Sequence, residues 1–237
     1  MATPVILLTG FEPFGGETTN PSWDVASRLQ KASIEGASIT ALRLPVDCKR
    51  AAQQLTATIT RLHPAAVIGL GQAGGRPALS IEKIAINLAD ERAENEAGER
   101  AEGRPIIRGG PDAYFARLPI PAIVSAITRN GIPAAMSLSA GAYVCNTVMY
   151  TALHVLRRRP ETPAGFIHLP YEAGQAVRHR ASASMSADLM VAGVRAALSE
   201  IVRTVERSDR LKVRRRSSSA SRNHRPPPSS VVRADIR

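Results

Sequence analysis

Residues 4–10, Pro-Val-Ile-Leu-Leu-Thr-Gly, begin the chain with an unbroken apolar run that ends at a glycine. Such a run is typical of a parallel strand that is buried on both faces. Similar strand patterns recur at residues 38–44, 65–70, 133–139 and 165–170. Helical patterns separate or follow them, at residues 21–29, 50–62, 119–130, 147–156 and 187–207. This alternation predicts a three-layer α/β/α domain with a mainly parallel, twisted, open sheet.

The glycines after the strand at 65–70 match a nucleotide-binding pattern, because Gly69, Gly71 and Gly74 spell GxGxxG. That fingerprint requires a helix that begins at its third glycine, so that phosphate meets the helix N-terminus. Gly75-Arg76-Pro77 breaks such a helix, and residues 78–86 alternate like a strand instead. We therefore expect no dinucleotide site and no cofactor.

The positive charge of the chain is concentrated at its C-terminus. The formal net charge is +11, and the residues from Arg207 onward hold nine Arg and one Lys against two Asp. The serine clusters and the prolines at 226–228 cannot bury a core. We predict a single domain over residues 1–208 and a disordered basic tail over 209–237, with nucleic-acid contact through the tail as an open alternative.

The two cysteines, Cys48 and Cys145, lie far apart in unlike contexts, which argues against a disulfide framework. The first residues show no signal-peptide pattern, and no apolar run approaches the length of a membrane span. These features predict a cytoplasmic protein without membrane contact.

Cys145 follows the small-residue turn Ser139-Ala-Gly-Ala142, at what we expect to be the start of a helix over 147–156. Backbone N–H groups and the helix dipole at such a position would lower the thiol pKa, which is typical of a nucleophile. The alternative is a buried cysteine that acts as a small apolar residue.

Two further residues carry candidate chemistry near predicted strand ends. Glu82 lies among apolar neighbours, either on an edge strand that faces solvent or as a buried acid that binds a cationic or donor partner. His168 could act as a general base, although four other histidines compete for that role: His63, His154, His179 and His224. No His and Cys pair has zinc-ligand spacing, so we expect no metal.

Four blocks of sequence resemble one known family. They are GFEPFGGETTNPSW at 10–23, GQAGGRPALSIEKIAIN at 71–87, SAGAYVCN at 139–146 and FIHLPY at 166–171. In this order they resemble pyroglutamyl-peptidase I (pyrrolidone-carboxylate peptidase), a family of cysteine peptidases, and weaker similarity extends the resemblance to residues 4–205.

The resemblance implies a catalytic triad of Glu82, Cys145 and His168, with the Cys145 N–H and Arg92 at the oxyanion. It implies an apolar pocket for a five-membered lactam ring, with Gln72 as the polar contact. The walls would be Phe11, Phe14, Tyr143 and Val144. The implied reaction removes an N-terminal pyroglutamyl residue from peptides through a thioester, without metal or cofactor. Members of the family are usually homotetramers, so a tetramer or dimer is expected.

Two loops depart from the family pattern, Ala93–Gly98 and Glu172–Gln175, and the basic tail has no counterpart in it. Two other functions stay open at this point. One is a nucleoside phosphorylase or hydrolase, because the family resemblance implies a phosphorylase/hydrolase-like fold; it would need a cluster of arginines for phosphate. The other is an RNA-associated protein that acts through its tail.

Overall fold

The chain folds around a seven-stranded sheet in the order β2-β3-β1-β4-β9-β5-β8. The computed structural model describes residues 3–90 and 103–222, with side chains through residue 207. The strands of the sheet are β1 (Val5–Phe11), β2 (Ser33–Ile34), β3 (Ala37–Leu44), β4 (Ala66–Gln72), β5 (Leu79–Glu82), β8 (Ala134–Ser137) and β9 (Ala164–Leu169). A separate hairpin pairs β6 (Ile84–Ile86) with β7 (Ala113–Phe115).

The sheet is mainly parallel, as predicted. The neighbouring pairs β3–β1, β1–β4, β4–β9 and β5–β8 are all parallel. Two pairs are antiparallel: β2 with β3, and β5 with β9. The second of these matters for the site, because it sets β5 against β9 with the chain running in opposite directions.

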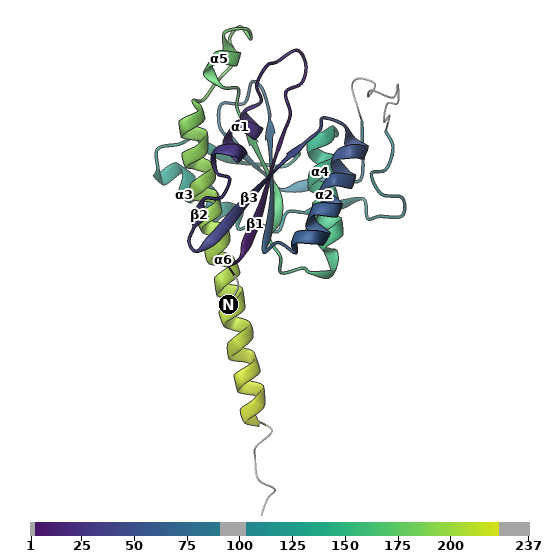
Figure 1. The fold of residues 1–237 in the computed structure, drawn as a ribbon, viewed down its shortest axis with the longest axis vertical. Coiled ribbons are helices and arrows are strands. Elements are labelled where there is room, and N and C mark those ends of the chain that lie inside the picture. The colour runs from purple at the N-terminus through teal and green to yellow at the C-terminus, as the bar shows by residue number, and fades with distance from the viewer. Residues whose placement is uncertain (1–2, 91–102, 223–237) are drawn as a thin grey trace, which may run out of the picture. The chain divides into compact units, whose positions relative to one another are not determined.

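Helices cover both faces of the sheet, which confirms the α/β class. They are α1 (Pro21–Arg28), α2 (Cys48–Leu62), α3 (Ile120–Arg129), α4 (Val144–Val155), α5 (Ala173–Ala176), α6 (Ala187–Arg222) and the short 3₁₀ helix η1 (Leu156–Arg158). In Figure 1, α2 and α4 lie on one side of the strands, while α1, α3 and the first turns of α6 lie on the other. The described residues include no helix that is long and apolar enough to cross a membrane.

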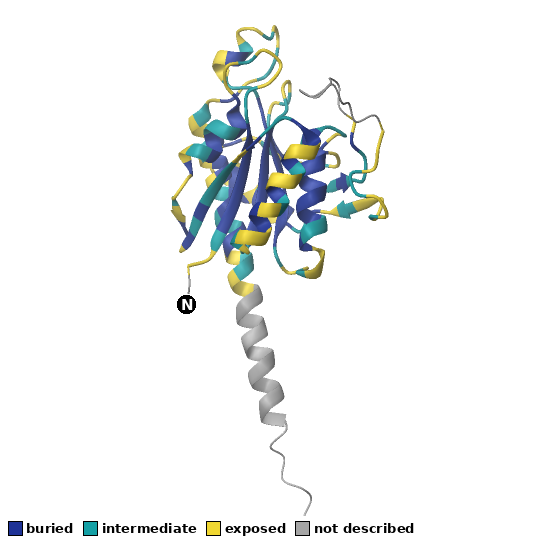
Figure 2. Ribbon diagram, turned by 45° about the vertical axis from the view of Figure 1, so that its right-hand side comes forward, coloured by how far each residue is buried: buried dark blue, intermediate teal, exposed yellow. Residues whose placement is uncertain are grey.

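The core lies between the sheet and the inner faces of these helices, where Figure 2 shows the buried residues. Side-chain caps lie at the starts of α1 and α2. Asn20 accepts a hydrogen bond from the Ser22 N–H at α1, and Asp47 accepts one from the Arg50 N–H at α2. The Asn20-Pro21 start is therefore where the sequence predicts it.

The region around Cys145 differs from its sequence-based prediction. Helix α4 begins at Val144, ahead of the expected Thr147, so Cys145 lies inside the first turn. Tyr143 makes no side-chain cap, which removes the sequence signal for this start. The Asn146 side chain accepts from the Ile86 N–H and donates to the Ile86 and Leu88 carbonyls, all at 2.9 Å, and so ties the helix start to β6.

The chain divides into two compact units, Met1–Val205 and Glu206–Arg237. The sequence predicts disorder from residue 209, whereas the structure continues α6 as helix through Arg222. A physical reason is that this segment contains Arg, Lys and Leu, which favour helix, and holds no proline before Pro226. Residues 223–237 lie outside the described residues.

Candidate active site

A cavity of about 710 Å³ opens where several strands end. Its lining includes Gln72 at the end of β4, His168 in β9, and Phe14 and Val46 beyond β1 and β3. The carboxyl ends of parallel strands are the usual place for ligand sites in open α/β sheets. A second hollow of about 550 Å³ is lined by Glu12, Arg43, Pro45, Arg50, Gln53 and Gln54, which include no thiol and no imidazole.

Glu82 and His168 meet diagonally across the antiparallel pair β5–β9. Ser80 lies opposite His168 in the register, and Glu82 lies opposite Phe166. Because alternate residues share a face, the carboxylate and the imidazole extend on the same side, within reach of each other. Glu82 Oε1 lies 2.7 Å from His168 Nδ1, and both residues are buried. The buried-acid interpretation of Glu82 therefore holds, and its partner is His168.

Glu82 has a second partner, Arg76, from the loop between β4 and β5. Arg76 Nη1 donates to Glu82 Oε1 at 2.6 Å, so this one oxygen receives both contacts. Arg76 also lines the cavity. The carboxylate is thus fully buried yet paired with an imidazole and a guanidinium, which offsets the cost of removing its charge from water.

Cys145 lines the same cavity as His168 and is half-buried. Its sulfur lies beside Gly71 of β4, since a Cβ at Gly71 would stand 2.9 Å from Cys145 Sγ. Gly71 is the register partner of His168 on β9. Because Gly71 has no side chain, the Cys145 thiol fits against β4, next to the strand β9 that carries His168. Backbone N–H groups in the first helical turn have no intrahelical acceptor, so the Cys145 N–H can donate to a ligand.

The charges in this cluster favour neutral forms of the thiol and the imidazole. Burial, together with the negative charge of Glu82, raises the pKa of Cys145 to about 12. Burial also lowers the pKa of His168, because the contact with Glu82 only partly compensates for it. The prediction that the helix start lowers the thiol pKa is therefore wrong here. The desolvation of the thiolate and the nearby carboxylate outweigh the backbone N–H groups.

The ionised form of Glu82 sets the tautomer of His168. Burial alone would raise the pKa of Glu82, but hydrogen bonds from His168, Ser137 and Arg76 lower it overall. An ionised carboxylate can only accept hydrogen bonds, so the hydrogen of the neutral imidazole lies on Nδ1. His168 Nε2 then carries a lone pair, which is what a general base requires.

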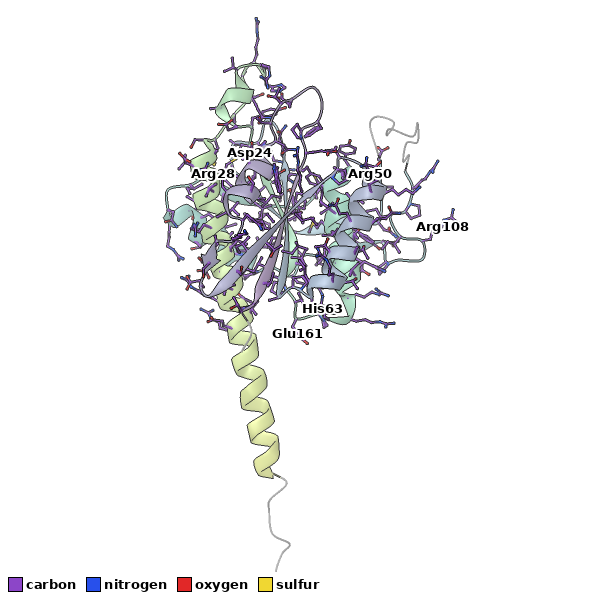
Figure 3. The ribbon with its side chains drawn as sticks, viewed as in Figure 1. Asp24, Arg28, Arg50, His63, Arg108 and Glu161 are labelled. Atoms are coloured by element: carbon purple, nitrogen blue, oxygen red, sulfur yellow. The ribbon has the colours of Figure 1, made fainter. Side chains whose placement is uncertain are left out.

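The other described histidines occupy different places. His63 is the left-handed C-cap of α2, and Figure 3 shows it at the opposite end of that helix from Arg50. The ring of His154 lies 2.9 Å from the Tyr114 hydroxyl. The His179 ring stacks on Tyr171. His224 lies outside the described residues.

Comparison with known proteins identifies the family. The family model described as pyroglutamyl peptidase matches residues 5–204. The chain belongs to the pyroglutamyl peptidase family. A pyrrolidone-carboxylate peptidase of Chromobacterium violaceum is 47% identical over 193 residues, which is 81% of this chain and 90% of that protein. Its counterpart in Erwinia tasmaniensis is 46% identical over 194 residues, 82% of this chain and 91% of that one.

Solved structures of pyroglutamyl peptidases share the fold. Pyroglutamyl peptidase I from Bacillus amyloliquefaciens superposes with a TM-score of 0.79 at 38% identity, covering 85% of this chain and 96% of that one. Pyrrolidone carboxyl peptidase from Thermococcus litoralis gives a TM-score of 0.82 at 34% identity, covering 86% and 96%. The protein is accordingly a cysteine peptidase of the pyroglutamyl-peptidase class.

The predicted pocket residues of this pyroglutamyl peptidase divide into three groups. Phe14, Gln72 and Tyr143 line the cavity. Phe11 and Val144 are 2% and 3% exposed, belong to the hydrophobic core and are not among the residues that line the cavity, so their role as pocket walls stays a prediction. Phe11 packs against Phe166, with ring centroids 6.4 Å apart. Arg92 lies outside the described residues.

Sequence reasoning missed several residues of the cavity. In the sequence, Arg76 indicates only a helix break within Gly75-Arg76-Pro77, although a carboxylate within an apolar strand requires a cationic or donor partner. Tyr171 and Asp90 also line the cavity. Gln175 is 1% exposed and donates to Gln72 Oε1 at 2.9 Å. It lies in the Glu172–Gln175 segment that departs from the family pattern, and it orients the amide of Gln72.

Within the described part of the chain, no group of three or more His, Cys, Asp or Glu could hold a metal ion. The phosphorylase alternative needed a cluster of arginines for phosphate. Arg76 lines the cavity, but its guanidinium is paired with Glu82. This arginine therefore gives little support to a phosphate site.

Proposed function

We propose that the protein removes N-terminal pyroglutamyl residues from peptides and proteins through a thioester on Cys145, with His168 as the base and Glu82 as its orienting acid. The observation that carries this proposal is the 2.7 Å contact between Glu82 and His168 at the wall of a cavity that also holds Cys145. Family membership supplies the substrate class.

In the first step, His168 Nε2 takes the proton from the Cys145 thiol as sulfur bonds to the carbonyl carbon of the pyroglutamyl residue. The carbonyl oxygen gains the electron pair and is stabilised by the Cys145 N–H, with Arg92 as a second donor implied by the family resemblance. Collapse of this intermediate breaks the carbon–nitrogen bond. The imidazolium returns its proton to the leaving amine, and a thioester remains.

In the second step, water replaces the departed peptide. His168 takes a proton from the water as its oxygen attacks the thioester carbon. The carbon–sulfur bond breaks, the proton passes to Cys145, and free pyroglutamate leaves. Glu82 stabilises the imidazolium in both steps and holds its Nδ1–H, as a buried acid does for a histidine base.

The cavity lining suits an uncharged lactam. Phe14 and Tyr143 offer aromatic surface, and the amide of Gln72, oriented by Gln175, offers a hydrogen bond. Free glutamate carries two more charged groups than its lactam, and removing these from water costs free energy that the uncharged lactam avoids. The pocket therefore favours the cyclised residue over its open form.

Turnover of pyroglutamyl-7-amido-4-methylcoumarin tests the proposal. We expect activity in the wild type. In Cys145→Ser we expect kcat to fall by at least about 10⁴-fold, because the variant lacks the thiol nucleophile. Cys48→Ser is the matched control. Cys48 is buried at the start of α2 and accepts a hydrogen bond from Thr147 Oγ1 at 3.2 Å, away from the cavity lining. Wild-type inactivity in folded protein, or an active Cys145→Ser, would contradict the proposal.

We also propose a cytoplasmic location, which the cysteine usage favours, and a homo-oligomeric state, either dimer or tetramer, which the family resemblance implies. Light scattering coupled to size-exclusion chromatography measures the assembly directly.

A further inference from the structure

Arg76 connects the wall of the cavity to the buried carboxylate. Its side chain is 34% exposed, whereas that of Glu82 is 0% exposed. The guanidinium therefore has one edge toward the cavity and another toward Glu82. An arginine in this position can act on the reaction without being the nucleophile, the base or the acid.

The contacts of Arg76 reach three parts of the site. Nη1 donates to Glu82 Oε1 at 2.6 Å, the oxygen that also contacts His168 Nδ1. Longer contacts run from Nη1 to Ser137 Oγ at 3.5 Å and from Nη2 to the Ser139 carbonyl at 3.4 Å. Ser139 begins the turn that leads to Cys145. The same side chain thus links the acid of the site to the backbone that precedes its thiol.

The charge of Arg76 also opposes that of Glu82 at the imidazole. Glu82 favours a protonated His168, while Arg76 disfavours it. Glu82 from β5 contacts His168, and the other titratable groups that line its cavity are Arg76 from its loop, Cys145 from α4, Asp90 and Tyr171. On β4 its neighbour is Gly71, which is not titratable. Arg76 is the permanent cation of this set.

We propose that Arg76 is a positioning residue of the reaction: it holds the Glu82 carboxylate in the orientation that presents His168 to Cys145 as a neutral base. The inference rests on the proposed function for the identity of the base. A guanidinium is suited to this role because it remains charged at all working pH values and offers several donors in a fixed plane. A neutral side chain would lose the charge-assisted contact with Glu82 and would hold the carboxylate less firmly.

The test compares Arg76→Gln, Arg76→Lys and the control Arg28→Gln in pH profiles of kcat and kcat/KM. Arg28 pairs with Asp188 outside the cavity lining. We expect Arg76→Gln to lower kcat by about tenfold to a hundredfold with little change in KM, as a misplaced catalytic group does. Its acid limb should move to higher pH, because the charge that opposes imidazole protonation is gone. Arg76→Lys should keep the acid limb of the wild type and recover most of kcat.

Three results would overturn the inference: an unchanged kcat in Arg76→Gln, a rise in KM alone, or equal losses in both variants without movement of the acid limb. If Arg76→Gln does not fold, Arg76→Lys decides, since a shifted acid limb in that variant also contradicts the proposal. Alkylation of Cys145 by iodoacetamide, located by mass spectrometry, gives a readout without substrate. If the wild type cleaves no pyroglutamyl substrate, the proposed function fails, whereas the pH dependence of alkylation still tests Arg76.

Discussion

Cys145 Sγ rests against the backbone of Gly71, so closely that a methyl group on Gly71 would stand 2.9 Å from the sulfur and 2.7 Å from the Phe166 ring. Gly71→Ala should therefore displace the thiol and destabilise the fold by about 1–3 kcal/mol. We expect kcat to fall by more than about tenfold, because a shift of about 1 Å at a reacting atom is enough to do so. Steady-state kinetics and thermal unfolding measure the two effects.

Gly165→Ala is the matched control for that prediction. Its Cβ would meet Leu118 at 2.5 Å, which is also a close contact with a buried side chain, but away from Cys145. This variant should lose stability while keeping kcat per folded molecule. Equal losses of kcat in the two variants would show that the effect at Gly71 is general destabilisation.

Glu82→Gln removes the negative charge that accompanies the imidazolium and permits the wrong tautomer of His168. We expect kcat to fall by about 10²-fold to 10⁴-fold, by analogy with the buried acid of serine-protease triads. Glu17→Gln is the control, because Glu17 makes a 2.8 Å contact with His179 that resembles the Glu82–His168 pair but lies outside the cavity lining. A kcat that survives Glu82→Gln would refute the orienting role.

The pH dependence of kcat/KM should follow His168 alone in the neutral range. Burial lowers the pKa of His168 from its usual 6.5, so the neutral base persists below that pH and the acid limb lies there. The pKa of Cys145, about 12, keeps the thiol protonated, so no alkaline limb is expected between pH 7 and about 9. A bell-shaped profile centred near neutrality would instead indicate a thiolate–imidazolium pair in the free enzyme.

The fold followed from the sequence because its signals are local. Continuous apolar runs mark β1 and β4, and the Asn20-Pro21 pair marks the start of α1. The antiparallel setting of β5 against β9 has no such signal. It depends on pairings between residues far apart in the chain. This antiparallel pairing explains why Glu82 and His168, which are 86 residues apart in the sequence, lie diagonally opposite each other in the sheet.

The site was predicted in part, for a related reason. Residue type and family resemblance indicated Glu82, Cys145 and His168, but burial decides the protonation states and burial is a property of the folded chain. The helix start at Cys145 therefore suggested a lowered thiol pKa, whereas desolvation raises it. Phe11 and Phe14 lie in the same short sequence motif. Phe11 is the last residue of strand β1 and is buried in the core, whereas Phe14 lies beyond the strand and is exposed.

Phe14 and Phe11 should respond differently to truncation. Phe14 lines the cavity and is 37% exposed, so Phe14→Ala should raise KM for pyroglutamyl substrates about tenfold with little loss of stability. Phe11 is 2% exposed, so Phe11→Ala should cost about 3–5 kcal/mol of unfolding free energy. Urea unfolding and KM measurements separate the two roles, and a stability loss in Phe14→Ala as large as that in Phe11→Ala would contradict this assignment.

Deletion of residues 209–237 should leave the peptidase intact. The buried residues of α6 end at Val202, and the first compact unit ends at Val205, so the deletion removes no described part of the core. We expect kcat/KM within about twofold of the full chain and an unchanged melting temperature, as for substitutions away from buried contacts.

Deletion of residues 198–237 is the control, because it also removes Leu198, Ile201 and Val202, which are exposed by 3% or less. That shorter chain should unfold at lower temperature. Binding to a polyanion such as poly(U) should decline steeply with salt in the full chain and be lost in the 209–237 deletion, since the residues from Arg207 onward carry most of the net charge. A peptidase activity that disappears with residues 209–237 would mean that the basic segment acts in catalysis or folding, and not as an appendage to a complete domain.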